Sequence, residues 1–251
     1  RIADILATWD RAIEQTERLI EKKEELKKGL IEELVTGKKR FPGFNGEWGE
    51  YELGDIFSFL KTSSFSRKEL TNDEEEGNAL YFHYGDLHTG FKSNVVNCEE
   101  EQVPLVKSDR KLPEKVELLK DGDLIVADAS EDYEGIGSSI EIEGIGEKTA
   151  IAGLHTLALR DSEGVTVKGF RGYILNSREV RIKLIKASTG SSVFGLSKRN
   201  LSKVRVRLPS KEEQIKIVDI IKYLELNFEK SKKKLKILKS EKQGLLNSLF
   251  S

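Results

Sequence analysis

The sequence predicts an α+β protein in which a globular domain is flanked by two long helices that form an antiparallel coiled coil. Three observations lead to this fold class. Each end of the chain carries a long amphipathic repeat, the middle carries short strand-like apolar runs, and 34% of the 251 residues are charged, more than one compact core needs. We divide the chain into a long helix at 1–40, a globular domain at 41–210 and a second long helix at 211–251.

The first long helix is predicted over residues 1–36. Apolar side chains recur at steps of three and four residues with charges between them, and Gly37 follows the last of them. The apolar positions are Ile2, Ile5, Leu6, Trp9, Ala12, Ile13, Leu19, Ile20, Leu26, Leu30 and Leu34. So long a helix with so narrow a stripe requires a partner helix. We expect Trp9 to lie in the buried stripe, with a contact to a partner protein as the alternative.

The second long helix, predicted over 215–249, repeats the first at an offset of 215 residues. The offset aligns Asp4 with Asp219 and Gly29 with Gly244. A glycine inside a helix costs about 1 kcal/mol, so its recurrence favours duplication over a pattern that all coiled coils share. The apolar positions are Ile217, Val218, Ile221, Leu224, Phe228, Leu235, Leu238, Leu245 and Leu249. If the two helices pair within the chain, they must run antiparallel.

The central region predicts short strands and helices. A connector rich in glycine and proline occupies 42–49. A helix is predicted over 171–187, a short helix over 197–204 with Ser197 as its N-cap, and then a strand that ends at Pro209. Apolar runs predict strands at 79–84, 123–128, 139–144 and 154–160.

The charge of the chain is unevenly distributed. The net charge is -1, from 42 Lys+Arg against 43 Asp+Glu. Residues 41–165 carry a net charge of -16, whereas residues 166–210 carry +10. The near-neutral total is therefore a cancellation, and the basic tract at 166–210 is a candidate surface for phosphate groups.

Several classes of protein are excluded. No apolar run approaches the roughly 18 residues of a membrane span, and the charged residues of 1–40 do not fit a secretory signal, so we expect a soluble, cytoplasmic protein without a membrane partner. Cys98 is the one cysteine, which excludes an internal disulfide and a cysteine-cluster metal site. The sequence contains no methionine, so we expect the natural start to lie outside this stretch.

Motifs of catalysis are missing from the sequence. A P-loop, a nucleophile elbow, a His-Glu-x-x-His pair and the Asn/Asp-Pro-Pro-aromatic motif of amino-methyltransferases are all absent, and we expect no catalytic residues and no cofactor. Gly135-Ile136-Gly137 and Gly144-Ile145-Gly146 lack the third glycine and the helix of a dinucleotide site, so we interpret them as turns.

A metal site is the weaker interpretation of one polar cluster. His83, Asp86 and His88 are expected at a strand end and turn, without the i, i+4 relation of helical metal ligands. We expect them to be solvated turn residues or nucleic-acid contacts, and we expect no metal. The acidic clusters at 73–76 and 99–101 are expected in solvated loops.

Two long segments of the sequence resemble the specificity subunits of type I restriction-modification systems. The run GSSVFGLSKRNLSKVRVRLPSKEEQIKIVDII is similar to the junction between a target-recognition domain and a conserved helix in that family. The run KKGLIEELVTGKKRFPGFNGEWGEYELGDIF resembles the helix end and domain start. The matching positions there are Gly29, Leu30, Gly37, Lys38, Phe41, Trp48, Leu53 and Gly54. The resemblance covers essentially the whole chain.

The resemblance implies an architecture. The full subunit of that family has two target-recognition domains, each followed by a conserved helix, and the helices pack antiparallel as a ruler. This chain resembles the first helix, the second recognition domain and the second helix. We therefore expect a truncated subunit or a rearranged half-subunit.

The resemblance also implies a non-catalytic reader of double-stranded DNA. Such a reader recognises one half of a bipartite target, docks methyltransferase (M) subunits through its helices and associates indirectly with the restriction (R) subunit. A homodimer through the helices would supply a second reading domain. Two alternatives stay open: a coiled-coil scaffold that binds no DNA, and the recognition portion of a fused restriction-methylation enzyme.

The candidate DNA contacts lie mostly in the basic tract. Hydroxyl groups, cations and backbone N–H groups beside Gly190 suit phosphate contacts. The candidates there are Lys186, Ser188, Thr189, Ser191, Ser192, Lys198, Arg199 and Asn200. We expect base contacts from Arg199, Asn200, His83, Tyr84 and His155. Arg205 and Arg207 fit a DNA-facing strand and a solvated strand face equally well.

Overall fold

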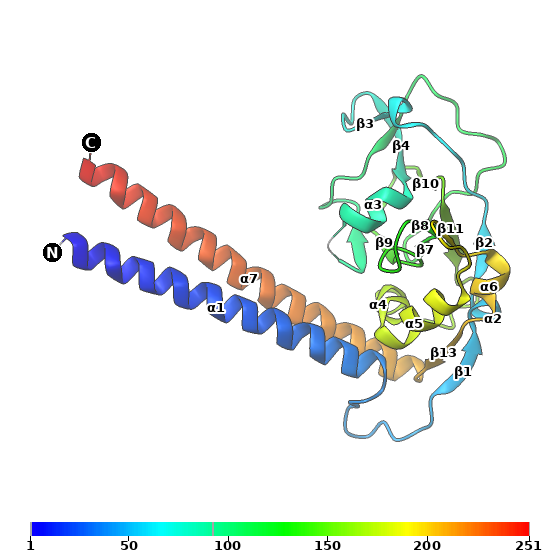
Figure 1. The fold of residues 1–251 in the computed structure, drawn as a ribbon, viewed down its shortest axis with the longest axis horizontal. Coiled ribbons are helices and arrows are strands. Elements are labelled where there is room, and N and C mark those ends of the chain that lie inside the picture. Colours follow the sequence, from blue (N-terminus) through cyan, green and yellow to red (C-terminus); the bar gives the residue numbers. More distant parts are fainter. Residues whose placement is uncertain (1, 92, 251) are drawn as a thin grey trace. The chain divides into compact units, whose positions relative to one another are not determined.

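The chain folds into two compact units in a computed structural model that describes residues 2–91 and 93–250 (Figure 1). The helical unit contains the long helices up to Leu34 and from Lys216 onward. The head domain contains residues Val35–Ile215. Within the described residues, no helix is both long enough and apolar enough to cross a membrane.

Helices α1 (Ile2–Val35) and α7 (Lys211–Phe250) run antiparallel in the helical unit. Residue numbers rise along α1 as those of their partners on α7 fall, which confirms the predicted pairing. The cross-helix contacts join Asp10 to Lys242, Glu17 to Lys239 (2.7 Å), Lys23 to Ser231 (2.9 Å) and Lys27 to the ring of Phe228 (4.7 Å to its centroid).

The apolar seam of α1 is narrower than the sequence predicted. Ile2, Ile5, Leu19 and Leu26 are exposed, Leu26 to 73%. Ile5, Leu19 and Leu26 directly precede three partly buried residues, which are Leu6, Ile20 and Lys27 respectively. A two-helix seam accepts only one of two adjacent positions. The prediction was therefore wrong for these four side chains. Trp9 is partly buried, and the side chain of Leu249 lies outside the described residues.

The contacts of the helical unit repeat at the offset of the sequence. The Thr16 hydroxyl donates to the Ala12 carbonyl at 2.7 Å, and Ser231, its equivalent, donates to the Asn227 carbonyl at 2.9 Å. Glu17 pairs with Lys239. Their equivalents, Lys232 and Glu24, also attract one another: Lys28 lowers the pKa of Glu24 most, and Lys232 lowers it further. The duplication thus extends to the contacts, which generic coiled-coil composition does not explain.

The head domain is built on two mixed sheets. The first has the strand order β2 (Ser58–Leu60), β11 (Thr156–Arg160), β7 (Leu124–Ala127), β9 (Ser139–Glu143) and β5 (Val95–Asn97). The second has the order β10 (Ala150–Ala152), β4 (Gly77–Phe82), β6 (Leu105–Lys107) and β3 (Leu70–Thr71). Only the pairs β5–β9 and β10–β4 within these described sheets are parallel. One apolar cluster, which includes Phe82, Ile125 and Ile142, packs both sheets together.

Two shorter strand pairs complete the head domain. β1 (Gly49–Glu52) pairs with β13 (Arg205–Leu208), and β8 (Ala129–Ser130) pairs with β12 (Phe194–Gly195). The small helices are α2 (Leu53–Ile56), η1 (Arg67–Glu69), α3 (Tyr84–Thr89), α4 (Arg171–Asn176), α5 (Arg178–Ala187) and α6 (Lys198–Ser202).

Two predicted elements of the head domain are wrong. The helix expected over 171–187 is broken at Ser177, which is extended (ψ 146°) and buried, and whose hydroxyl donates to the Ile174 carbonyl at 2.8 Å. The turn expected around residues 83–88 is helix α3, and His83 caps it by accepting from the Gly85 N–H at 3.1 Å. Each error involves a side chain that bonds its own backbone, which periodicity does not detect.

The pairing of α1 and α7 predicts an unequal effect of two aromatic substitutions on α7. Phe228 is 6% exposed and Tyr223 is 63% exposed. We expect Phe228→Ala to lower the free energy of unfolding by about 3 kcal/mol because the seam does not refill the cavity, and Tyr223→Ala to change it by about 0.5 kcal/mol or less. Urea unfolding followed by far-ultraviolet circular dichroism measures both. Equal effects of the two substitutions would contradict the seam.

Candidate nucleic-acid interface

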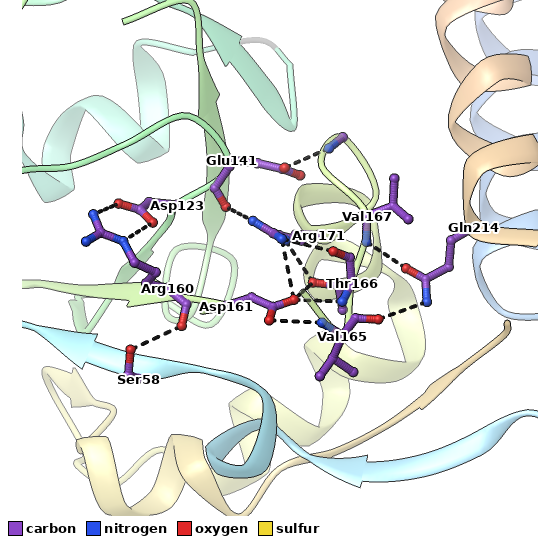
Figure 2. A network of polar contacts seen from close by, with 12 residues as sticks. Ser58, Asp123, Glu141, Arg160, Asp161, Val165, Thr166, Val167, Arg171 and Gln214 are labelled. Carbon is purple, nitrogen blue, oxygen red and sulfur yellow. Dashed lines mark hydrogen bonds and ion pairs between the residues drawn. The ribbon is translucent and has the colours of Figure 1, made fainter. Parts of the chain in front are cut away.

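A buried polar network orders the start of the basic tract (Figure 2). Arg171, only 6% exposed, donates to the carbonyl of Gly122 at 2.6 Å and to the Thr166 hydroxyl at 2.8 Å. It also lies 3.4 Å from a carboxylate oxygen of Asp161. Glu141 accepts from the N–H groups that flank Arg171 in the chain, those of Gly169 and Gly172. The charge of Arg171 therefore stabilises the fold and does not face a ligand.

Asp161 is held in its ionised form by this network. Burial opposes ionisation, but hydrogen bonds from Thr166 and Val165 and the charge of Arg171 outweigh it and hold the pKa of this carboxyl below its ordinary value. The Thr166 hydroxyl and N–H both donate to Oδ2 at 2.6 Å, and the Val165 N–H donates to Oδ1 at 3.0 Å. These contacts shape the loop between β11 and α4.

The first turn of α7 is tied to the head domain through two buried polar side chains. Gln214 accepts from the Val167 N–H at 2.8 Å (Figure 2). It also donates to the Pro209 carbonyl at 3.0 Å. Glu213 accepts two hydrogen bonds from Arg40, at 2.9 and 2.7 Å. These bonds raise the pKa of the Arg40 guanidinium. The Pro-x-x-Glu-Glu-Gln run of the sequence is therefore an anchor within the head domain, and Arg40 is a partner that spacing did not reveal.

Much of the charge of the basic tract is engaged in ion pairs. Lys183 pairs with Glu179 at 2.9 Å, and Arg207 lies 3.4 Å from the same carboxylate group. Arg205 faces Glu52 across the β1–β13 pair at 3.2 Å. Arg181 donates to backbone carbonyls of residues 133, 134 and 136. The net charge of +10 thus overstates the cationic surface, and the contacts of Arg205 and Arg207 favour the solvated strand face.

Several of the remaining cations lie on or next to the loop that follows α5. A hollow of about 590 Å³ has Lys186, Ser188, Thr189, Asn200 and Lys203 among its lining residues. We call these residues, with Ser191, Ser192, Lys198 and Arg199, the loop surface. Across the part of the chain that the structure describes, the side chains of Lys186, Arg199 and Lys203 make no hydrogen bond or ion pair. Their positive charge is therefore available to an anionic ligand.

The loop surface is held in shape by hydrogen bonds. Thr189 and Gly195 exchange backbone bonds of 2.9 and 2.7 Å, and Gly190 has a φ of 126°, a conformation that glycine adopts readily. The Ser188 hydroxyl donates to the Ile185 carbonyl at 2.7 Å, and the Asn200 amide donates to the Ala187 carbonyl at 2.8 Å. Asn200 therefore caps α5, and a two-bond contact with a base would require that hydrogen bond to break.

The second group of predicted residues forms a cluster of rings. The rings of His83 and Tyr84 lie 4.5 Å apart, and those of Tyr84 and His155 lie 5.4 Å apart edge to face. Burial, followed by the charge of Arg67, lowers the pKa of His83. His155 Nδ1 lies 3.5 Å from a carboxylate oxygen of Asp128. The structure thus brings the three predicted rings together.

Asp128 joins the ring cluster to the loop surface. Its carbonyl accepts from the Leu196 N–H at 2.7 Å, and its carboxylate interacts with His155 and Lys198. Burial raises the pKa of this carboxyl, and the interactions with His155 and Lys198 oppose that effect. The Lys198 ammonium lies 5.5 Å from the centroid of the Phe59 ring. Sequence reasoning missed Asp128, although it directly follows the buried strand β7.

A metal site receives no support from the described side chains. Among them, no three His, Cys, Asp or Glu residues gather as metal ligands do. The side chain of His88 lies outside the described residues. Burial, with a smaller contribution from Asp121, raises the pKa of the Cys98 thiol to about 12. That thiol is therefore neutral over the ordinary pH range, and a neutral thiol is neither a nucleophile nor a metal ligand.

The architecture is that of specificity subunits of type I restriction-modification systems. The chain superposes on the S subunit from M. genitalium with a TM-score of 0.56 at 18% identity, over 98% of this chain and 58% of that one. The HsdS subunit from Thermoanaerobacter tengcongensis gives 0.56 at 17% identity, over 98% and 56%. A chain from the structural study of "complex assembly" and "conformational transition of the type I R-M system" gives 0.59 at 17% identity, over 100% and 58%.

Residues 45–239 match the type I restriction modification DNA specificity domain, and the chain belongs to that family. The predicted family and the predicted α+β fold with flanking helices are confirmed. The chain spans a little over half the length of the solved chains that it resembles.

The buried network predicts that two arginines of the basic tract act differently on stability. We expect Arg171→Met to lower the free energy of unfolding by about 3–5 kcal/mol, because Asp161 and Glu141 lose their cationic partner in a buried site. Arg199→Met, at an exposed position, should change it by about 0.5 kcal/mol or less. Fluorescence of Trp48 during urea unfolding, in a Trp9→Phe background, reports on the head domain alone. Similar effects would contradict the network.

The lowered pKa of Asp161 predicts a pH dependence of stability. The unfolded carboxyl titrates near pH 3.9, so the stabilisation is complete above that pH and is lost as the pH falls through the lower folded value. We expect the difference in Tm between the protein and Asp161→Asn to be constant from pH 7 to about pH 5 and to narrow below about pH 4. Calorimetry from pH 7 to pH 2 measures it. A difference that widens in acid would contradict the assignment.

Proposed function

We propose that the chain is a non-catalytic reader of double-stranded DNA that recognises one half of a bipartite target. The observation that carries the proposal is the loop surface on a domain of the DNA specificity family. Within the described residues, the side chains of Lys186, Arg199 and Lys203 on this surface lack acidic partners, whereas other cations of the tract are neutralised within the fold. A cluster of this kind suits phosphate groups, and its binding energy is independent of sequence.

Phosphate contacts would position the duplex, and base contacts would specify it. Lys186, Lys198, Arg199 and Lys203 supply cations, and the exposed hydroxyls of Thr189, Ser191 and Ser192 supply short donors beside glycine. Arg199, Asn200, His83, Tyr84 and His155 are the candidates for base edges. The link through Asp128 supports one continuous reading surface, because it places the ring cluster beside the loop surface.

The paired helices would set the distance between half-sites and bind the partner subunits. A helix of 40 residues is about 60 Å long, and its cross-helix contacts oppose sliding of one helix past the other. The exposed apolar side chains of Leu19 and Leu26 support docking of M subunits, and through them of the R subunit. A homodimer through the helices would supply a second reading domain.

The proposal predicts that three cations of the loop surface govern DNA binding. We expect the combined variant Lys186→Gln, Arg199→Gln, Lys203→Gln to bind random 30-base-pair duplexes more weakly. The slope of log affinity against log salt concentration should be about 3 units less steep, since each phosphate contact contributes about 0.9. Mobility shifts over a salt series measure both quantities.

A matched control separates the site from overall charge. The combined variant Lys233→Gln, Lys234→Gln, Lys236→Gln removes the same charge from exposed positions of α7 and should leave the slope unchanged. If both variants lose the same affinity, the loop surface is the wrong site. If the unmodified chain binds no duplex at low salt, the proposed function is wrong and a protein-binding scaffold is the better interpretation.

A further inference from the structure

We propose that His155 is a specificity-determining residue that reads one base pair, and that Asp128 is a positioning residue that fixes which ring nitrogen of His155 faces the DNA. This inference rests on the proposed function. Asp128 is absent from the sequence-based candidates, and for His155 the structure supplies a mechanism that the sequence did not.

The backbone of His155 is strained. Its φ is 55°, and it is the only described residue other than glycine with a positive φ. Glycine would adopt this conformation without steric cost, and histidine tolerates it better than most side chains do. The His155 carbonyl accepts from the Asp128 N–H at 3.1 Å, so the surrounding structure holds the unfavourable conformation. Such strain at a partly exposed polar residue is typical of a functional position.

Two neighbours orient the imidazole ring of His155. The edge-to-face contact with Tyr84 restricts the plane of the ring, and Asp128 lies beside Nδ1. The side chain is nevertheless 49% exposed. A carboxylate at Nδ1 selects the tautomer that carries its proton there, so Nε2 of the neutral ring is the hydrogen-bond acceptor. An acceptor in this place suits the exocyclic amino group of adenine or cytosine in the major groove.

The polar groups beside the ring suit the same ligand. Lys198 interacts with Asp128 and is held over the ring of Phe59, and the chain from Leu196 leads directly into α6. His83 lies on the other side of Tyr84. A phosphate held by Lys198 would therefore lie close to the base that His155 reads. Asp128 interacts with both groups, which accounts for a carboxylate on a cationic surface.

The strain permits a test in which stability and specificity change in different directions. His155→Gly removes the imidazole ring and also the steric conflict, so the Tm should be unchanged or higher. We expect the variant to keep its affinity for random 30-base-pair duplexes and its salt slope. We also expect the variant to lose base preference at one base pair when bound duplexes are selected from a randomised pool and sequenced.

Asp128→Asn and two further variants complete the experiment. Asp128→Asn keeps the shape of the side chain but no longer selects one tautomer, so the preference should weaken at the same base pair. His155→Asn tolerates the backbone conformation and should change the preference there. Leu154→Ala, at the neighbouring exposed residue, should keep the preference at every position.

The outcomes are distinguishable. If the unmodified chain binds no duplex at low salt, the proposed function itself fails. If it binds duplexes and His155→Gly retains every base preference, the inference about His155 is overturned. If Asp128→Asn changes a different base pair, or if His155→Gly lowers the Tm and weakens all preferences together, the pair has a structural role and the inference is again overturned.

Discussion

The head domain depends on the polar anchor at the first turn of α7. Arg40 follows α1 in the chain, and its bidentate contact with Glu213 brings that segment to the start of α7. Gln214 adds bonds to the loop that the Asp161–Arg171 pair shapes. Buried charges are tolerated only when they are paired and hydrogen-bonded, so one element cannot move without leaving the others unsatisfied. The anchor therefore fixes the points at which the chain enters and leaves the head domain.

Because buried cations stabilise the fold, the net charge of the basic tract overstates the charge that is available to a ligand. A count of Lys and Arg treats all cations alike, but Arg171, Arg181 and Lys183 neutralise groups of the protein itself. Two of the ion pairs, Arg171 with Asp161 and Arg205 with Glu52, join the basic tract to the acidic segment of the sequence. The cations around the hollow beside α5 are among those that remain to attract an anion.

Local signals made part of the fold predictable. The seam of Ile13 and Ile20, the cap at Ser197 and the alternating strand Arg205–Leu208 each follow from a period or a spacing within a few residues. The three-residue strands depend on contacts with segments far away in the chain, and the break at Ser177 involves a hydrogen bond from its side chain to the nearby Ile174 carbonyl, which periodicity does not detect. The candidate site follows the same rule. His83, Tyr84 and His155 were identified by residue type, whereas the role of Asp128 depends on a fold that joins β7 to the loop after α5.

The duplicated helices α1 and α7 share the residues of their seam but differ in the residues of their exposed faces. At the seam, Thr16 and Ser231 are equivalent, and so are Lys27 and Lys242, which contact the facing helix. Polar side chains at a seam disfavour shifted registers, because a shift leaves them without partners. On the exposed faces the equivalence is lost: Leu19 and Leu26 correspond to Lys234 and Glu241. The exposed apolar side chains occupy different positions on the two helices: Leu19 and Leu26 on α1, and Tyr223, Leu226 and Ile237 on α7. The pair is therefore symmetric at its seam and asymmetric on its exposed faces.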